Sequence, residues 1–345
     1  MNQTSVRSTL QAPIGPTDLF VCPRCGGDLD ENRASGNLSC GGCGTIIRFE
    51  NGIYVFEAVV SGDYDIKKTI SAFGRRWNAV FKRMGALTEF FLPSIQPVRK
   101  ELFRDKVIVD GGGGFGRLSK LMLDYGARHV VLVDASDGVY AAREYLAPYR
   151  DRVTIVRANL LNPPLKVGAF DIFLCHGVLH HTGAPRRVLG NIARALDPAR
   201  GITILWVYAK EGNRLLARLI ATARTACASI GDKGRWMVAS VVDFLFWVLT
   251  NAVYRPLDRL FGIKGKLYYG EYFMDFLYDS AFNNRVDRLQ MYHDFLTTRI
   301  VEYYSRNELE AWLRAAGFKK ISLHFYRRQS WSVAASFDPD ENFSG

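Results

Sequence analysis

The stretch VIVDGGGGFGRLSKLM, residues 107–122, places four consecutive glycines directly after an apolar run that ends in an aspartate. Glycines at such a junction permit a tight turn from a strand into a helix, so this stretch constrains the fold more than any other. Taken as G-x-G-x-x-G, with Gly111, Gly113 and Gly116, it predicts a loop that cradles the pyrophosphate of a dinucleotide. The same residues also satisfy a second pattern, so the loop alone leaves two ligand classes open.

The second pattern is D-x-G-x-G-x-G, which begins at Asp110 and takes Gly112, Gly114 and Gly116. This form suits S-adenosylmethionine, which carries no phosphate. Asp134 ends the next predicted strand, where a carboxylate can accept both ribose hydroxyls of either cofactor. Asp110 favours S-adenosylmethionine, because a carboxylate directly before the glycines would repel a pyrophosphate but attract an ammonium and a sulfonium.

From residue 106 onward, strand-like and helix-like segments alternate along the chain. Such alternation predicts an α/β fold with helices on both faces of a parallel sheet. We expect a Rossmann-like, doubly wound and mostly parallel seven-stranded sheet, with an aromatic-rich helical insertion between its fifth and sixth strands. The predicted strands are KVIVD, HVVLVDAS, VTIVRAN, AFDIFLCH and GITILWVYA, followed after the insertion by KKISLHFYRR and SWSVAASF.

Four of the six cysteines form two C-x-x-C pairs with 14 residues between them, and each pair is followed by glycine. Two such turns supply a closed tetrahedral set of four sulfurs, which leaves no position for water or substrate. The pattern therefore predicts a structural Zn²⁺ site in a zinc ribbon that contains a hairpin at Asn51-Gly52. The predicted ligands are Cys22, Cys25, Cys40 and Cys43.

These patterns divide the chain into predicted segments. The large domain carries the cofactor loop, and the ribbon precedes it. The predicted boundaries are a disordered leader at 1–16, the zinc ribbon at 17–60, a helical linker or lid at 61–104, the large domain at 105–337 with its insertion at 212–300, and a tail at 338–345.

The net charge of +11 invites an anionic partner such as nucleic acid, a membrane surface or an acidic substrate. However, the Lys and Arg residues are scattered instead of forming a basic stripe, so nucleic acid is not favoured. The first residues contain no continuous apolar core, and the cysteine pairs are typical of metal sites in a reducing compartment. We therefore expect a cytoplasmic protein, either a monomer or a homodimer.

The order of the motifs resembles that of class I S-adenosylmethionine-dependent methyltransferases of the type 11 kind. The resemblance covers about residues 106–210, with a weaker match from residue 303 to the end. The ribbon followed by this domain is similar to a subgroup with a zinc-binding N-terminal extension, which includes some ribosomal-RNA methyltransferases. The segments that carry the likeness are VDGGGGFGRL, VLVDAS, VRANLLNPPL, FDIFLCHGVLHHTGAP and RALDPARGITILWVY.

The resemblance implies roles for individual residues. Asn159 stands where the family usually has an aspartate beside the adenine amino group, and this departure puts adenine recognition in doubt. Cys175 and His176 end the fourth strand, where the methyl group would face its acceptor. The implied cofactor-binding residues are Asp110, Gly112, Gly114, Gly116, Asp134, Asn159 and Cys175.

Aromatic and histidine residues supply the remaining candidates. SAFGRRWNAVF resembles a segment that closes over the cofactor in related proteins, which would make Phe73 and Trp77 cofactor contacts; their spacing of four also fits plain core packing. His176, His180 and His181 are the titratable groups nearest the predicted acceptor position. We therefore take them as candidate catalytic bases, although histidines in such a loop also pack or cap.

The insertion contains an apolar run, residues 236–254, with Asp243 as its one charge. Its length is close to the roughly 20 residues that a membrane span needs. A single crossing would place strands of one sheet on opposite sides of the bilayer, so we expect no transmembrane span. The thin polar stripe predicts a mostly buried helix, which would act as a lid over an acceptor pocket, a dimer face or a peripheral membrane contact.

Taken together, the sequence predicts a methyltransferase that acts on a small-molecule acceptor, which would be bulky, apolar or lipid-like. Transfer would be a direct in-line displacement, in which the enzyme aligns the reactants and deprotonates the acceptor. An RNA base in rRNA or tRNA is the alternative acceptor. An NAD(P)-dependent oxidoreductase and a non-catalytic binding module are the less favoured alternatives.

Overall fold

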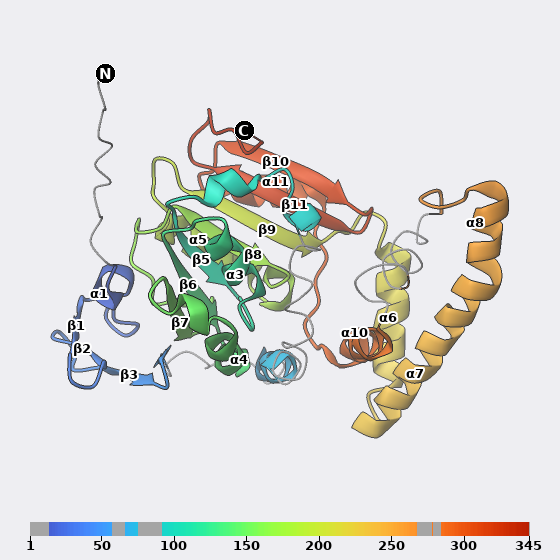
Figure 1. Ribbon diagram of the computed structural model, residues 1–345, viewed down its shortest axis with the longest axis horizontal. Coiled ribbons are helices and arrows are strands. Elements are labelled where there is room, and N and C mark those ends of the chain that lie inside the picture. Colours follow the sequence, from blue (N-terminus) through green and yellow to red (C-terminus); the bar gives the residue numbers. More distant parts are fainter. Residues whose placement is uncertain (1–13, 57–65, 75–91, 268–277, 279–283, 345) are drawn as a thin grey trace, which may run out of the picture.

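The computed structural model describes residues 14–56, 66–74, 92–267, 278 and 284–344 (Figure 1). A central sheet with helices on both faces forms the body of the molecule. The ribbon strands lie at one end of this body, and a group of long helices lies at the other. Most of the predicted leader at 1–16 and half of the predicted linker at 61–104 fall outside the described residues.

The seven strands after residue 105 form the main sheet in the order β7-β6-β5-β8-β9-β11-β10. Strands β5 to β9 are parallel, and β11 is antiparallel to both β9 and β10. This confirms the predicted Rossmann-like, mostly parallel α/β architecture. The strands are β5 (Val107–Gly111), β6 (His129–Asp134), β7 (Val153–Arg157), β8 (Ile172–His176), β9 (Ile202–Tyr208), β10 (Lys320–Tyr326) and β11 (Ser330–Ser336).

The register brings the carboxyl ends of the parallel strands to one edge. Asp110 pairs with Leu132 across β5 and β6, and with Leu174 across β5 and β8. The loops that follow β5, β6, β7 and β8 therefore emerge side by side, which is where ligands bind in open parallel sheets.

Short helices follow most of these strands. Helix α5 shows why they form, because its residues Val188, Leu189 and Ile192 recur at helical spacing and are buried against the sheet. Helix α11 begins at a capping box formed by Ser305 and Glu308. The helices around the sheet are η3 (Lys100–Phe103), α3 (Arg117–Asp124), α4 (Gly138–Tyr145), η4 (Ala147–Tyr149), η5 (Leu179–His181), α5 (Pro185–Ala195) and α11 (Arg306–Ala315).

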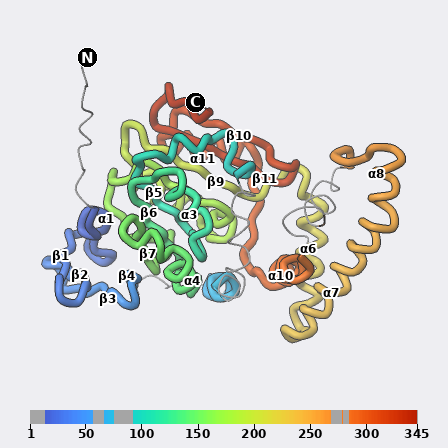
Figure 2. The backbone as a smooth tube through the Cα atoms, in the orientation of Figure 1, coloured from blue at the N-terminus to red at the C-terminus, as the bar shows by residue number. Residues whose placement is uncertain are grey.

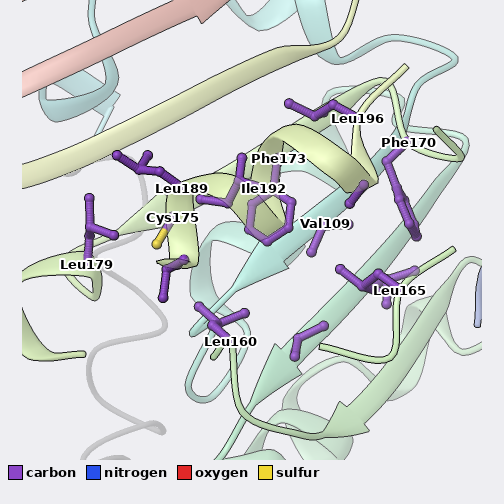
Figure 3. Close-up of a cluster of buried hydrophobic side chains, with 14 of the residues drawn as sticks. Val109, Leu160, Leu165, Phe170, Phe173, Cys175, Leu179, Leu189, Ile192 and Leu196 are labelled. Carbon is purple, nitrogen blue, oxygen red and sulfur yellow. The ribbon is translucent and has the colours of Figure 1, made fainter. Parts of the chain in front are cut away.

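Two apolar clusters fill the two faces of the sheet. Figure 3 shows part of the first, in which Phe173 and Cys175 of β8 lie among side chains from helix α5 and neighbouring loops. Strand residues alternate between the faces, so Val109 joins the first cluster and Ile108 the second. Both faces are covered, as the near-continuous apolar strands require.

The ribbon consists of α1 (Pro16–Leu19), β1 (Leu29–Glu31), β2 (Leu38–Cys40), β3 (Ile46–Glu50) and β4 (Ile53–Val55). Asn51 and Gly52 both have positive φ, which confirms the predicted hairpin turn between β3 and β4. A feature that the sequence did not reveal is that β4 pairs in parallel with β7. The ribbon therefore extends the main sheet instead of hanging from it.

The insertion forms a separate helical group, which Figures 1 and 2 show at the end of the molecule opposite the ribbon. It contains α6 (Arg214–Ala226), α7 (Asp232–Val248), the π-helical segment η6 (Leu249–Tyr254), α8 (Arg255–Phe261) and α10 (Arg285–Thr297). Helices α7, η6 and α8 form one continuous helix over Asp232–Phe261, and only 17% of its most apolar window is buried. The prediction of a mostly buried helix is therefore wrong.

The error has a physical cause. The polar stripe of this helix points inward, where Asp243 meets Arg288 of α10 with an Oδ1–Nε distance of 2.7 Å. The hydroxyl of Tyr278 also donates to Asp243. Because the partner of Asp243 lies 45 residues further along the chain, the sequence of the helix alone gave no sign of which face is inside.

Candidate functional site

The glycine loop joins β5 to α3 in a conformation that needs glycine. Gly112, Gly114 and Gly116 all have positive φ, a region that other residues rarely adopt. A Cβ on Gly112 would also lie 2.3 Å from a methyl group of Val178. The backbone of the loop can therefore approach the loop after β8, and the gap between them opens into a cavity.

Asp110 lies beneath this loop and is almost fully buried. Its carboxylate accepts a hydrogen bond from the hydroxyl of Ser119 at 2.6 Å. A Cβ on Gly113 would lie 2.9 Å from the Asp110 carboxylate, so the missing side chain leaves room for it. Burial raises the pKa of Asp110 to about 6, although the Ser119 hydrogen bond opposes the rise. Asp110 supports the loop from below and is not among the residues that line the cavity.

Asp134 ends β6 and lines the cavity. One carboxylate oxygen accepts from both the backbone N–H and the hydroxyl of Ser136, at 2.7 and 2.6 Å. The other accepts from the backbone N–H of Gly114 at 2.9 Å. Burial raises the pKa of Asp134, and these hydrogen bonds act in the opposite direction. The carboxylate is thus held rigidly between the glycine loop and the loop after β6.

Asn159 follows β7 and also lines the cavity. Its Oδ1 accepts a hydrogen bond from the backbone N–H of Leu161 at 2.9 Å. Because a backbone N–H can only donate, this contact identifies the amide oxygen and leaves Nδ2 as the group that can meet a ligand. The residue that departs from the family pattern is therefore oriented as a donor.

The cavity has a volume of about 120 Å³ and lies at the carboxyl ends of the parallel strands. A helical segment over residues 66–74 covers it and contributes Thr69 and Phe73. The Thr69 hydroxyl is buried and has no hydrogen-bond partner among the described residues. The lining comprises Ile66, Thr69, Ile70, Phe73, Gly112, Val133, Asp134, Ala135, Ser136, Ala158, Asn159, Leu160, Leu161, His176, Gly177, Val178, His181 and Thr182.

The helical segment rests directly on the loop after β6. A Cβ on Gly74 would lie 3.0 Å from the backbone nitrogen of Asp137, so the two backbones approach closely. The ring of Phe73 packs against His181 with 5.1 Å between centroids. Phe73 thus lies at the cavity, whereas Trp77 falls outside the described residues.

The structure separates the three candidate histidines. His176 lines the cavity, and its Nε2 lies 2.7 Å from the hydroxyl of Ser94. Burial lowers the pKa of His176 to about 3, and the charge of Arg117 adds to the effect. His180 is almost fully buried, does not line the cavity, and has a pKa well below its usual value because of burial.

His181 has the most suitable geometry for accepting a proton. Its Nδ1 lies 2.6 Å from the carbonyl oxygen of Ile300. A carbonyl can only accept, so Nδ1 carries the proton and Nε2 is the basic nitrogen of the neutral ring. His181 also lines the cavity, which brings this histidine, Asp134 and Asn159 together around one space.

Besides Asp110, three of the predicted cofactor residues do not line the cavity. Cys175 is fully buried in the cluster of Figure 3, and burial raises the pKa of its thiol to about 12. Gly114 and Gly116 shape the loop without reaching the cavity, although Gly114 donates to Asp134. A side chain at Gly116 would clash with Leu146 at 2.5 Å.

Sequence reasoning missed Trp206, which belongs to an aromatic wall beside the histidines. Trp206 of β9 stacks on His176 with 5.1 Å between ring centroids. Tyr208, two residues later on the same face of β9, stacks on Tyr303 at 5.6 Å. The alternation of WVY at the end of β9 carried this signal, because residues two apart share one face of a strand.

The four ribbon cysteines converge. Their sulfur atoms all lie within 4.8 Å of one another, and Cys22–Cys43 and Cys25–Cys40 are separated by 3.5 and 3.4 Å. Tetrahedral zinc with Zn–S bonds of about 2.3 Å places sulfurs about 3.8 Å apart, so the arrangement fits the ion. The hydroxyl and backbone N–H of Thr45 lower the pKa of Cys43 to about 6, whereas hydrogen bonds with the neighbouring thiols raise the pKa of Cys25 to about 12.

Comparison with known families agrees with the geometry. Residues 109–204 match the family described as a methyltransferase domain. This match covers the glycine loop, Asp134, Asn159 and the histidine loop, and it confirms the resemblance that the sequence motifs suggested.

Curated relatives match only in part. The chain is 36% identical over 77 residues to protein arginine N-methyltransferase 1 of Saccharomyces cerevisiae, which covers 22% of each protein. It is 33% identical over 99 residues to tRNA U34 carboxymethyltransferase of Helicobacter pylori, which covers 28% of this chain and 38% of that protein. The chain thus spans well under half the length of these relatives.

Among solved structures, one similar chain is a 1,6-didemethyltoxoflavin-N1-methyltransferase of Burkholderia thailandensis. It shares 15% sequence identity with a TM-score of 0.44, over 77% of this chain and 88% of that one. Another comes from a Haloferax volcanii complex between the Trm112 methyltransferase activator and a methyltransferase, with 14% identity and a TM-score of 0.45 over 80% and 99% of the two chains.

Proposed function

We propose that the protein transfers a methyl group from S-adenosylmethionine to a small apolar or aromatic acceptor. The observation that carries this proposal is the cavity that joins Asp134 and Asn159 on one side to His181 on the other. It lies within the methyltransferase domain and at the strand ends where such cofactors bind.

The polar groups of the cavity fit an adenosine. An ionised carboxylate offers about four lone-pair sites. Asp134 uses three of them in hydrogen bonds within the loops, so at least one remains for a ribose hydroxyl. Asn159 would donate from Nδ2 to a ring nitrogen of the adenine. The hydroxyl of Thr69 would gain the partner that it lacks among the described residues.

The helical segment over residues 66–74 would act as the lid. The cavity beneath this segment has a volume of about 120 Å³, which is smaller than the roughly 300–1,000 Å³ of typical ligand sites. The segment must therefore move outward to admit a cofactor. The contacts of Gly74 with Asp137 and of Phe73 with His181 would re-form over the bound ligand.

When bound, S-adenosylmethionine supplies a methyl group already activated by the sulfonium. The protein then has to align the acceptor, exclude water and remove a proton where the acceptor carries one. His181 would take that proton on Nε2, while the Ile300 carbonyl holds the ring in place. His176, with a pKa of about 3, is too weak a base for this step and would position the acceptor instead.

The walls around the histidines favour a small acceptor with an apolar or aromatic body. The ring of Trp206 stacks on that of His176, and the ring of Tyr208 lies tilted against that of His180. Flat aromatic walls bind flat apolar molecules through buried area and ring stacking.

Calorimetric titration with S-adenosylhomocysteine and, separately, with NADH tests the cofactor. We expect micromolar binding of S-adenosylhomocysteine only, weakened at least about tenfold by Asp134→Ala because the ribose hydroxyl loses a charged partner. Asp151→Ala is the matched control, since this carboxylate is almost fully exposed. Binding of NADH, or of neither compound, would refute the proposal.

A second test concerns the base, with any acceptor found by screening methyl transfer. His181→Gln should lower kcat by about 10²–10⁴-fold while leaving the affinity for S-adenosylhomocysteine within a few fold. His176→Gln should act mainly on KM for the acceptor. The reverse pattern would make His176 the base.

We also propose that the ribbon holds one structural Zn²⁺. A ribbon of this size buries too little apolar surface to be stable without a metal. Metal analysis should give one zinc per chain, and Cys40→Ser should abolish it. Chelation should lower the melting temperature, because β4 is part of the main sheet. A metal-free protein with an unchanged melting temperature would contradict this assignment.

A further inference from the structure

The long helix of the insertion, Asp232–Phe261, has its polar and apolar faces reversed relative to a helix of a water-soluble domain. Between residues 237 and 253, every exposed position carries an apolar side chain. Met237 is 67% exposed and Leu245 60%. Helices at a protein surface normally direct such residues inward and expose polar ones.

The face toward α10 holds the buried polar groups of the helix, beside the rings of Trp236 and Phe246, which stack on His293 and Tyr292. Asp243 and Thr250 are buried on it, and Asp243 is bound by Arg288 and Tyr278. Breaking a buried charge pair is strongly unfavourable. The helix therefore cannot rotate to hide its apolar face against α10, and that face stays at the surface.

The apolar face is large. Of the nineteen large apolar side chains exposed in the described part of the chain, eleven lie on this helix. A 30-residue helix is about 45 Å long. Contiguous apolar patches beyond a few hundred Å² mark an interaction site. The eleven are Met237, Val241, Phe244, Leu245, Trp247, Val248, Leu249, Val253, Leu257, Leu260 and Phe261.

Basic residues stand at both ends of this face. Lys233 is exposed at the start of the helix, and Arg259, Lys264 and Lys266 are exposed at or just after its end. Residues 212–267 contain nine Lys and Arg against three Asp. Asp232 accepts from His293, and Asp258 accepts from the backbone of Lys264, so two of the acidic groups are already engaged.

This charge pattern distinguishes between two possible partners of the apolar face. A second copy of the chain, packed either parallel or antiparallel, would bring basic ends against basic ends. A bilayer that contains anionic lipids would instead place phosphates beside every basic end and acyl chains under the apolar face. Long Lys and Arg side chains reach head groups readily from such a position, and Trp247 suits the interface between the two layers.

We propose that the helix Asp232–Phe261 is a monotopic anchor that lies in the plane of an anionic lipid bilayer. It does not cross the bilayer, because the opposite face holds the Asp243–Arg288 pair against α10 and both ends of the insertion return to one sheet. The proposal rests on this surface alone and is independent of methyl transfer.

Vesicle flotation of the full-length protein tests the anchor. One set of vesicles contains only phosphatidylcholine, and the other contains equal parts phosphatidylcholine and phosphatidylglycerol. We expect the protein to float with the anionic vesicles, to float much less with the neutral ones, and to be partly released by high salt. A failure to float with either set at moderate salt would overturn the proposal. Equal flotation with both would overturn the assignment to anionic lipid.

Matched substitutions locate the surface. Val241→Glu with Val248→Glu places two charges on the apolar face and should weaken partitioning at least about tenfold. Val167→Glu is the control, because Val167 is 64% exposed and Val241 53%, but Val167 lies in the loop before β8. Circular dichroism should show that all variants keep their helix content. Equal loss in the control would contradict the localisation.

Light scattering of the same variants distinguishes the bilayer from a second copy. A monomer in the absence of lipid, unchanged by Val241→Glu with Val248→Glu, supports the anchor. A dimer that this double variant converts to a monomer, together with no flotation, would overturn it in favour of self-association. If the double variant still binds S-adenosylhomocysteine, then a loss of membrane binding does not affect the proposed function, and the two proposals can be tested independently.

Discussion

Helices α5 and α7 use their apolar side chains in opposite ways. In α5 the residues Val188, Leu189 and Ile192 are buried against the sheet, while Arg186 and Arg187 are exposed. In α7 only Ala239 and Asp243 are buried, and most of its large apolar side chains are exposed. Helix α5 therefore exposes polar side chains to water. Helix α7 instead exposes apolar side chains and buries a charged pair.

The difference is informative because both helices belong to one chain. The contact that costs the most free energy to break decides which face of a helix is buried. In α5 that contact is apolar burial, and in α7 it is the buried pair of Asp243 and Arg288. The following predictions test this comparison, from the largest expected effect to the smallest.

Asp243→Ala should lower the free energy of unfolding of the insertion by about 3–5 kcal/mol, because it removes the carboxylate that binds the buried guanidinium of Arg288. Hydrogen exchange should increase in α7 and α10, while binding of S-adenosylhomocysteine is retained. Asp151→Ala, at an almost fully exposed position, is the control. The double variant Asp243→Leu with Arg288→Leu should recover most of the lost stability. If it does not, the two charged side chains contribute to stability through more than their mutual ion pair.

Leucine truncation compares the two helices directly. Leu189→Ala in α5 removes a side chain that is 1% exposed and should cost about 2–5 kcal/mol. Leu245→Ala in α7 removes an exposed side chain and should change stability by no more than about 0.5 kcal/mol. Denaturant unfolding of both variants in lipid-free buffer measures the contrast. Comparable losses would mean that the face of α7 is covered in solution.

The sequence predicted the sheet side of the molecule well, and for a clear reason. Strand and helix periods, the glycines at positive φ and the paired cysteines are local signals that act over a few residues. They gave the seven strands, the Asn51-Gly52 turn and the four converging sulfurs. The sequence predicted only some of the residues that line the cavity outside the glycine loop.

What the sequence could not provide depends on contacts between distant segments. The pairing of β4 with β7 joins residues about 100 positions apart. Asp110 was expected beside the cofactor, but its hydrogen bond to Ser119 keeps it beneath the loop. The periodicity of α7 revealed a polar stripe without showing that Arg288 would draw this stripe inward.

Asp110 supplies a test on the sheet side of the comparison. Burial raises its pKa from 3.8 to about 6, so the folded protein binds the proton more tightly than the unfolded chain does. The favourable contribution of protonated Asp110 is present below pH 3.8 and is lost as the pH rises through about 6. Asp110→Asn should therefore stabilise the protein by up to about 3 kcal/mol at pH 7, and by almost nothing near pH 4.

Melting temperatures of the wild-type protein and Asp110→Asn across this pH range measure the difference. Binding of S-adenosylmethionine supplies the second readout, because its positively charged sulfonium would favour the ionised aspartate nearby. A variant that is more stable at pH 7 and also binds S-adenosylmethionine less tightly would show that the buried carboxylate serves the ligand. A stability difference that does not vary with pH would contradict the role of its ionisation.

The smallest expected effect concerns the lid. The Thr69 hydroxyl is buried without a hydrogen-bond partner among the described residues, and it lines the cavity. Thr69→Val removes an unsatisfied group at nearly constant shape, so the ligand-free protein should be unchanged or stabilised by up to about 1 kcal/mol. The same substitution should weaken S-adenosylhomocysteine binding several-fold, because the ligand loses one hydrogen bond.

Thr203→Val is the matched control for this prediction. Thr203 is equally buried, but its hydroxyl already donates to the Phe173 carbonyl at 3.1 Å. Its loss should therefore destabilise the ligand-free protein by about 1 kcal/mol and leave ligand affinity unchanged. Opposite signs in the two threonine variants would show that the lid side of the cavity is completed by a ligand, just as the apolar face of α7 is completed by a bilayer. Equal destabilisation would mean that Thr69 already has a partner in solution, and the lid would then need another source of affinity.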